Sequence, residues 1–231
     1  MLENKAWLFT VFIVMLVITG CDGVIRGPTA KVPYETVSFN ASDNVTLVAD
    51  YYPSQSDKGL VLLHMLARSR TTYRDLAPRL APHYKIVAID FRGHGDSQGD
   101  YQDLTEDDFR LMVRDVEAAA LFLQTEGVAE QDVSVVGASI GANIALQYAT
   151  EHPVDKLLLV SPGLRYQGID ISRADYDGPL LIQVGHYDAY SSISVDDLEL
   201  RLPGARVMSY DAVGHGTDLL KYDSGNRSDG S

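Results

Sequence analysis

The residues best suited to chemistry in this sequence surround Ser139, in the run Gly-Ala-Ser-Ile-Gly at 137–141. The β-branched run 133–136 before it is typical of a buried strand, and 142–149 after it favours a helix that Pro153 closes. A serine at such a strand-to-helix corner projects its hydroxyl out of the sheet, and the flanking glycines remove side chains that would collide. The pattern indicates a serine nucleophile, which needs a base and an acid from elsewhere in the chain.

The composition limits the classes of partner that this protein could bind. The chain has 231 residues, 45% of them hydrophobic, and a formal net charge of -13 at pH 7. Because it has no Lys/Arg cluster, we expect neither nucleic-acid binding nor electrostatic adhesion to an anionic bilayer. No residues have a metal-ligand spacing such as His-Glu-x-x-His, which disfavours a metal hydrolase.

Alternating strands and helices are expected to position the serine. An initial hairpin (36–39 and 45–52) precedes strands expected at 59–64, 85–90, 133–136, 156–161, 180–184 and 206–210. Helices are expected at 72–80, 105–127, 142–149 and 195–200. The second starts at a capping box of Thr105 and Asp108, ends at Gly127, and has an apolar face of Phe109, Met112, Val113, Val116, Ala120 and Leu123. This order predicts an α/β fold: a mostly parallel central sheet of about eight strands with helices on both faces.

Three motifs together resemble the α/β-hydrolase family, over essentially the whole mature length of the chain. Leu-Leu-His-Met-Leu at 62–66 is similar to the oxyanion-loop segment after the third strand of that family. Asp-Phe-Arg-Gly-His-Gly-Asp-Ser at 90–97 resembles its Asp-x-Arg-Gly-His-Gly-x-Ser loop, and 137–141 resembles its nucleophile elbow. The resemblance implies the α/β-hydrolase fold and a catalytic triad in the chain order nucleophile, acid, histidine.

The resemblance also assigns the acid and the base. Asp188 ends Gly-His-Tyr-Asp at 185–188, directly after the strand at 180–184, and matches the Gly-x-x-Asp of the family. Some relatives take the acid from the preceding strand, which leaves as alternatives Asp170, Asp175 and Asp177. His215, between two glycines after the last strand, is the expected base. The other histidines occupy structural positions in the family (His64 and His94), helix ends (His83 and His152) or a site two residues from the acid (His186).

The implied chemistry is acyl transfer through Ser139. His215 would take the serine proton while Asp188 fixes the imidazole tautomer. We expect the backbone N–H groups of Ile140 and Leu66 to form the oxyanion hole, with Met65 as the alternative to Leu66 because many relatives have glycine before the second donor. No cofactor and no metal is implied.

The substrate is expected to be a small-molecule acyl ester in an open site. Only the residues from Gly163 to Gly178 are available where this family inserts caps, which is too short for a helical cap domain. This favours a carboxylesterase or thioesterase acting on small to medium acyl groups, with a mouth lined by Arg165, Tyr166, Ile169 and Tyr190. The alternative is a non-catalytic member of the fold that serves in binding or interaction. The sequence indicates no oligomeric state.

The N-terminal residues predict export and a lipid anchor. Lys5 precedes an apolar run at 6–18, whose length suits a signal peptide and is short of the roughly 20 residues of a membrane span. Ile-Thr-Gly-Cys at 18–21 resembles a bacterial lipobox, and Cys21 is the only cysteine. An uncleaved N-terminal anchor is the alternative. We expect a membrane-anchored lipoprotein of the bacterial cell envelope, lipidated at Cys21, with a signal peptide at 1–20, a tether at 21–33, an α/β-hydrolase domain at 34–221 and a disordered tail at 222–231.

Overall fold

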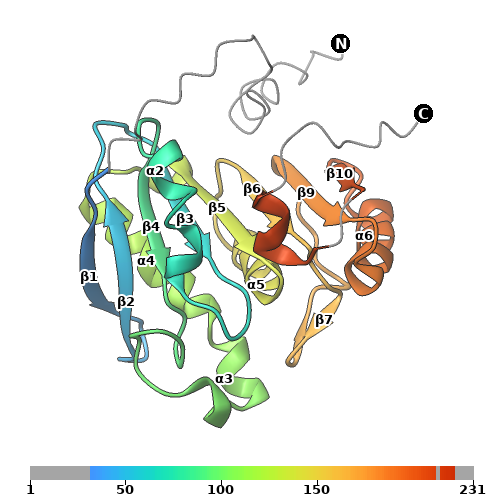
Figure 1. The fold of residues 1–231 in the computed structure, drawn as a ribbon, viewed down its shortest axis with the longest axis horizontal. Helices are drawn as coiled ribbons and strands as arrows, with labels where there is room; N and C mark the ends of the chain where they lie inside the picture. The colour runs from blue at the N-terminus through green and yellow to red at the C-terminus, as the bar shows by residue number, and fades with distance from the viewer. Residues whose placement is uncertain (1–31, 212–213, 222–231) are drawn as a thin grey trace. The chain divides into compact units, whose positions relative to one another are not determined.

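A computed structural model describes residues 32–211 and 214–221, whose elements are arranged as in Figure 1. Eight strands form one sheet in the order β1-β2-β4-β3-β5-β6-β9-β10. Their bounds are β1 Glu35–Asn40, β2 Thr46–Tyr52, β3 Gly59–Leu63, β4 Lys85–Ile89, β5 Val133–Ala138, β6 Leu157–Val160, β9 Leu180–Gly185 and β10 Arg206–Tyr210. The predicted signal peptide, Cys21, most of the predicted tether and the predicted tail lie outside the described residues.

The sheet is mostly parallel, as the sequence predicts. β2 pairs antiparallel with both β1 and β4, and every other pairing in the sheet is parallel. The carboxyl ends of β3, β5, β6 and β9 therefore meet at one edge of the sheet, the lower edge in Figure 1. In open α/β sheets this is the edge at which ligand sites form.

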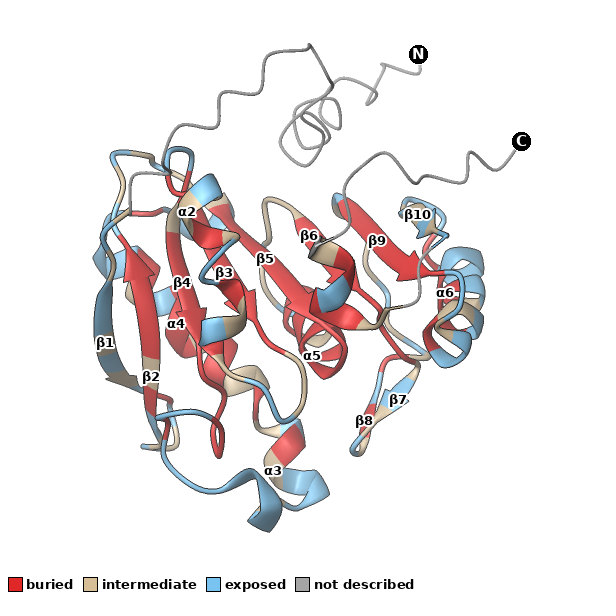
Figure 2. Cartoon of the chain, viewed as in Figure 1, coloured by how far each residue is buried: buried red, intermediate tan, exposed pale blue. Residues whose placement is uncertain are grey.

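Helices cover both faces of the sheet. α4 (Val113–Thr125) and α5 (Ile140–Ala149) pack against each other behind it, and α2 (Ala77–Leu80) lies in front (Figure 1). α6 (Ala189–Arg201) packs beside β9 and β10 and is longer than the predicted helix at 195–200. All residues of β3, β5, β6 and β9 are buried, as the red central strands of Figure 2 show, and burial on both faces explains their continuous apolar runs. The remaining short helices are η3 Tyr101–Asp103, η4 Glu130–Asp132 and η5 Gly216–Lys221.

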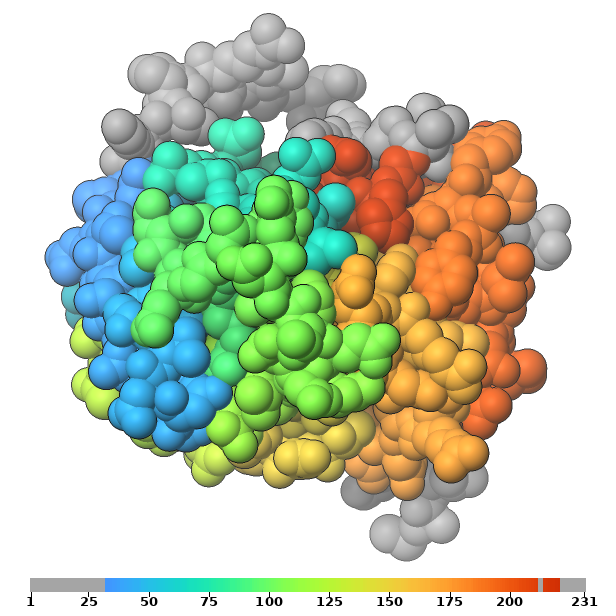
Figure 3. Space-filling view, turned by 90° about the horizontal axis from the view of Figure 1, so that it is seen from below, coloured from blue at the N-terminus to red at the C-terminus, as the bar shows by residue number. Residues whose placement is uncertain are grey.

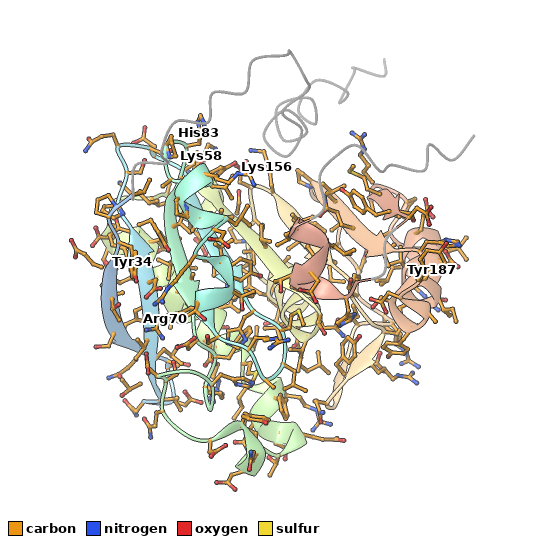
Figure 4. All side chains as sticks on the ribbon, in the orientation of Figure 1. Tyr34, Lys58, Arg70, His83, Lys156 and Tyr187 are labelled. Atoms are coloured by element: carbon orange, nitrogen blue, oxygen red, sulfur yellow. The ribbon has the colours of Figure 1, made fainter. Side chains whose placement is uncertain are left out.

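The predicted helix at 72–80 is wrong. The segment instead forms a short 3-10 helix, η2 (Arg70–Tyr73), followed by the single-turn α2. Pro78 cannot continue a helix from η2, because it lacks an N–H and its ring would clash with the carbonyl four residues earlier. Arg70 also fixes the start of the segment, since its buried side chain donates to Asp50 (2.8 Å) and its backbone N–H donates to Asp90 (2.6 Å). Figure 4 labels Arg70 on the β2–β4 side of the molecule.

The predicted helix between Thr105 and Gly127 is two helices, α3 (Glu106–Arg110) and α4. The capping box is confirmed, because Asp108 N–H donates to Thr105 Oγ1 (3.3 Å) and Thr105 N–H donates to the Asp108 carboxylate (2.9 Å). Between α3 and α4, backbone hydrogen bonds tighten to three-residue turns, for example from Met112 N–H to the Phe109 carbonyl. The expected apolar face is still buried apart from Val113, which is partly exposed. Nothing in the sequence marks this break.

A small hairpin stands where the family inserts caps, and the sequence did not predict it. β7 (Arg165–Tyr166) pairs antiparallel with β8 (Ile169–Asp170). The two turn residues, Gln167 and Gly168, both have positive φ (45° and 77°), which is the backbone of a type I′ hairpin. No helix occurs between residues 163 and 178, which agrees with the expected absence of a cap domain. Across the described part of the chain, no helix has the length and apolar character to span a bilayer.

Candidate active site

Ser139 lies at a sharp corner between β5 and α5. Its backbone is at φ 55° and ψ -122°, a strained conformation for a residue with a side chain. Its N–H donates to the carbonyl of Val160 (2.8 Å), and the residue is only 6% exposed. A Cβ on Gly137 would lie 2.1 Å from the carbonyl oxygen of Gly141, and a Cβ on Gly141 would lie 2.7 Å from that of His64. Both glycines are therefore required by backbone contacts at this corner.

The structure brings His215 and Asp188 to Ser139. His215 Nε2 lies 2.7 Å from Ser139 Oγ, and His215 Nδ1 lies 2.5 Å from Asp188 Oδ2. Asp188 is also the N-cap of α6, where its other oxygen accepts from Ser191 N–H (3.4 Å). The side chains of His215 and Asp188 are 35% and 11% exposed. These three residues, separated by up to 76 positions in the sequence, form one chain of hydrogen bonds at the lower edge of the sheet.

Two residues hold the His215 loop in place, in roles that sequence reasoning missed. Ser161, directly after β6, accepts the Gly216 N–H on its hydroxyl (2.9 Å) and is itself at positive φ (50°). The thioether of Met65 lies 3.2 Å from Thr217 N–H and 3.3 Å from its hydroxyl. Gly216 has φ 57°, and a Cβ there would lie 2.4 Å from Met65 Sδ. The only sequence signal was the position of Ser161 at the carboxyl end of a buried strand.

The loop after β3, where a second oxyanion donor was expected, is built on His64. This ring is fully buried, accepts the N–H of Phe91 on Nε2 (3.1 Å) and donates from Nδ1 to the carbonyl of Met65 (2.7 Å). Burial lowers the pKa of His64 to about 3, so the ring is neutral. The Met65 carbonyl is thus directed at the His64 ring, and the N–H of Leu66, on the opposite side of the same trans peptide, points away from it. The assignment of Leu66 and Ile140 as oxyanion donors stays a prediction.

The alternative acids and histidines lie elsewhere. Asp170 pairs with Arg165 across the hairpin (2.8 Å). Asp175 and Asp177 line a cavity of about 340 Å³ formed by the segments that precede β5, β6 and β9, at the edge of the sheet opposite Ser139. None of the other described histidines is hydrogen-bonded to Ser139 or Asp188. In the described ranges, no group of three or more His, Cys, Asp or Glu side chains could hold a metal ion.

Of the residues expected at the mouth, Ile169 is misplaced. It is 1% exposed and packs into the main core, because β8 directs it inward while its neighbour Asp170 faces solvent. Tyr166 is half-buried, and its ring centroid lies 6.5 Å from that of His215 and 5.3 Å from that of Tyr190. Figure 3 looks onto this face of the molecule, where the hairpin (yellow-orange) and α3 (green) come to the surface.

A family model described as serine aminopeptidase, S33 (Hydrolase_4) matches residues 54–175, just over half of the chain. The chain belongs to that family. The match contains Ser139 and stops before Asp188 and His215. The chain is 30% identical over 110 residues to an uncharacterized protein of Mycobacterium tuberculosis, covering 47% of this chain and 30% of that protein. It is also 31% identical over 118 residues to a soluble epoxide hydrolase of Corynebacterium sp., covering 49% and 38% respectively. The chain spans about a third of the length of these curated relatives.

Solved structures agree with the α/β-hydrolase fold. An esterase of Pyrococcus furiosus aligns with a TM-score of 0.66 at 21% identity, covering 78% of this chain and 82% of that chain. A membrane phospholipase A aligns with a TM-score of 0.65 at 18% identity, covering 87% and 82%. At these identities the likeness shows the fold alone.

Proposed function

We propose that this protein is a serine hydrolase that cleaves carboxylic ester or thioester bonds of small to medium acyl substrates. Ser139 would be the nucleophile, His215 the base and Asp188 the orienting acid. The observation that carries the proposal is the unbroken hydrogen-bonded chain of 2.7 Å and 2.5 Å through the two nitrogens of His215. A relay of this geometry, at a strained strand-to-helix corner, suits acyl transfer.

In the acylation step, Ser139 Oγ attacks the acyl carbon while its proton passes to His215 Nε2. The imidazolium so formed keeps its Nδ1–H on the carboxylate of Asp188, which stabilises the positive charge and holds the ring in the reactive tautomer. The His215 proton then passes to the leaving alcohol or thiol. The result is an ester between the acyl group and Ser139 Oγ.

The negative charge on the tetrahedral oxygen needs donors that are already in place. Ile140 is the first residue of α5, so its N–H belongs to the free donors of a helix N-terminus. Leu66 N–H, directed away from the His64 ring, would be the second donor. Water activated by His215 would then attack the acyl-enzyme, Ser139 Oγ would regain its proton, and no cofactor would be consumed.

The size of the acyl group is proposed from the segment that replaces a cap. Between β6 and β9 the chain supplies only the β7–β8 hairpin, so the mouth would be bounded by a few side chains such as Tyr166 and Tyr190. Tyr190 is 46% exposed, which is consistent with a mouth open to solvent. We therefore expect short and medium acyl chains to be preferred over long ones.

The test is to treat the full chain in mild detergent with a fluorophosphonate probe and with p-nitrophenyl esters of increasing acyl length. We expect one label on Ser139 and the fastest turnover with short to medium chains. Ser139→Ala should abolish both. Ser134→Ala is the matched control, because Ser134 is a buried serine of β5, the strand that precedes Ser139, and its hydroxyl has no hydrogen-bond partner. An unlabelled Ser139, or turnover that survives Ser139→Ala, would contradict the proposal.

We also propose that the protein is a lipoprotein of the bacterial cell envelope, anchored through Cys21. The lipobox-like run at 18–21 and the single cysteine support this. Several acyl chains, each burying CH₂ groups at about 0.8 kcal/mol apiece, would hold the protein at a membrane. The intact mass of membrane-extracted protein should then correspond to a chain that begins at a lipidated Cys21. Cys21→Ser should abolish both the cleavage before residue 21 and the lipid modification. An unmodified Cys21 in the mature protein would contradict the proposal.

The alternative function, a non-catalytic binding protein on the same fold, has no observation in its favour. Members that lose catalysis typically lose one of the three reacting side chains, and here Ser139, His215 and Asp188 are present and hydrogen-bonded. The esterase assay above discriminates the two, since a binding protein would show no turnover that depends on Ser139.

A further inference from the structure

The β7–β8 hairpin places a tyrosine against the reacting groups. The ring of Tyr166 lies edge-on to that of His215, and its hydroxyl interacts with the hydroxyls of Ser139 and Ser191. Neither the relay nor the oxyanion hole described above uses this tyrosine. The roles assigned so far therefore do not explain why a tyrosine hydroxyl lies next to Ser139 Oγ.

The hairpin that carries Tyr166 is held by three helices. Asn143 of α5, which is fully buried, donates to the Gly163 carbonyl (2.6 Å) and accepts the Gly163 N–H (3.1 Å). The hydroxyl of Tyr190 on α6 accepts from the N–H of Arg165 (3.1 Å) and donates to its carbonyl (2.7 Å). At the turn, Arg110 of α3 donates to the Gly168 carbonyl (3.1 Å). Anchors on both sides of the hairpin make Tyr166 a fixed group rather than a mobile lid.

Gly163 sets how closely the two tyrosines approach the sheet. A Cβ at this position would lie 2.6 Å from the Tyr166 ring and 2.4 Å from the Tyr190 ring. Both rings therefore occupy space that only glycine leaves free. The same close packing keeps the Tyr166 ring beside the Ser139 corner.

The neighbouring hydrogen bonds determine the direction in which the Tyr166 hydroxyl acts. Ser139 directs its proton to His215 Nε2, because His215 Nδ1 donates to Asp188. Ser191 uses its own proton to donate to the Ser161 carbonyl (3.2 Å). Neither serine therefore has a proton to give to Tyr166, so the phenol is the donor, and its single O–H can be directed at Ser139 Oγ. Burial raises the pKa of Tyr166, which keeps that proton on the phenol at neutral pH.

We propose that Tyr166 is a further catalytic hydrogen-bond donor, whose phenol O–H stabilises Ser139 Oγ when this oxygen is the leaving group of the acyl-enzyme. This inference rests on the serine-hydrolase function proposed above. In deacylation, water gives a proton to His215 and its oxygen bonds to the acyl carbon. The C–Oγ bond then breaks, and Oγ takes that proton back from His215. Tyr166 donates a hydrogen bond to Oγ while negative charge builds on it and keeps its own proton throughout.

Tyr166→Phe should therefore slow deacylation more than acylation. A hydrogen bond to a group that becomes charged is worth enough for a loss of about 10- to 100-fold in kcat. With p-nitrophenyl acetate the variant should show an initial burst of p-nitrophenol and an acetylated Ser139 that accumulates in the intact mass, with no rise in KM. Tyr176→Phe is the matched control, because the Tyr176 hydroxyl is buried without a hydrogen-bond partner at the opposite edge of the sheet; its kcat should equal that of the parent protein.

Three outcomes would overturn the inference. These are a kcat for Tyr166→Phe equal to that of the parent, a rise in KM with kcat unchanged, or a lower kcat without accumulated acyl-enzyme. Fluorophosphonate labelling and a thermal melt of each variant separate this result from other failures. A parent protein that is not labelled at Ser139 overturns the serine-hydrolase proposal, and this inference with it. A labelled and active parent whose Tyr166→Phe form behaves identically overturns only the role of Tyr166.

Discussion

Two histidines near the lower edge of the sheet, His64 directly after β3 and His215 directly before η5, have different kinds of hydrogen-bond partner. His64 is fully buried, and both of its nitrogens bond to backbone groups, the Phe91 N–H and the Met65 carbonyl. His215 is about one-third exposed, and both of its nitrogens bond to side chains, a hydroxyl and a carboxylate. The first arrangement fixes a neutral ring. In the second, the hydroxyl can give a proton to the ring, and the carboxylate can stabilise the charged ring that results.

This difference shows that the partners of a histidine, rather than its proximity to the site, determine what it can do. A backbone amide and a carbonyl cannot exchange a proton with the ring, so His64 supports the loop after β3 and does no proton transfer. The hydroxyl of Ser139 can lose a proton, and the carboxylate of Asp188 stabilises the charge that this transfer creates. Substitutions at the two histidines should therefore separate stability from activity.

His215→Ala should have the largest effect on activity and little effect on stability. Removing the base from a triad lowers kcat by about a million-fold in a comparable serine hydrolase system, so turnover of p-nitrophenyl acetate should fall to the background set by binding and the oxyanion donors. Because the side chain is partly exposed, urea unfolding should change by about 1 kcal/mol or less. A variant that keeps even a tenth of the parent kcat would show that His215 is not the base.

Asp188→Asn should lower kcat by roughly 10,000-fold, since the amide holds the imidazole in the wrong tautomer while preserving its position. The matched control is Asp170→Asn, at the alternative acid, which pairs with Arg165 on the exposed side of the hairpin. That control should retain kcat within a few-fold. The opposite ranking of the two variants would transfer the acid role to Asp170.

His64→Gln should reverse the pattern, with a loss of stability that depends on pH. Its folded pKa of about 3 lies below the unfolded value of 6.5, so the neutral ring contributes stability that is fully present above pH 6.5 and is lost as the pH falls toward 3. The linked free energy is on the order of 5 kcal/mol. In urea titrations, the variant should be less stable than the parent at pH 7, and the gap should narrow at pH 4.5. Burial also lowers the pKa of His94, which should keep part of the slope in the variant. Parallel pH profiles of the two proteins would contradict this account of His64.

Ser161→Ala should have the smallest effect, on both stability and activity. It removes the hydroxyl that accepts the buried Gly216 N–H and so leaves that donor without its partner, at a cost of about 1–3 kcal/mol. Because Gly216 follows His215, the base should also be less well positioned, with kcat lower by about tenfold. Steady-state kinetics and a thermal melt on the same sample measure both. A large loss of stability without any change in kcat would show that Ser161 supports the fold but does not position His215.

The sequence was informative wherever a motif tied a residue to the end of a strand. Ser139 could be placed because backbone contacts at its corner leave room only for glycine at positions 137 and 141. That steric requirement appears in the sequence as the spacing of the two glycines around the serine. The strands of the sheet and its mostly parallel character followed from apolar runs that alternate with helices, although the order of the strands did not. Asp188 and His215 needed the family resemblance in addition, because nothing in their local sequence distinguishes them from turn residues.

The parts that could not be predicted depend on contacts between distant segments. The β7–β8 hairpin is held by Asn143, Tyr190 and Arg110, which come from three separate helices. The break between α3 and α4 leaves the apolar periodicity intact, so no local pattern reveals it. Ser161 and Tyr166 matter only because the folded chain brings them to Gly216 and Ser139. Such roles are properties of the tertiary structure and have no signature in the neighbouring residues.

The most direct test of the central claim is the rate at which a fluorophosphonate probe modifies Ser139, followed by intact mass and peptide mapping. The account predicts a single adduct, located on Ser139, that forms rapidly in the parent protein. It also predicts that His215→Ala slows adduct formation by several orders of magnitude, although this variant remains folded. Adducts on another residue, or an unchanged rate of labelling in folded His215→Ala, would contradict the claim that His215 activates Ser139.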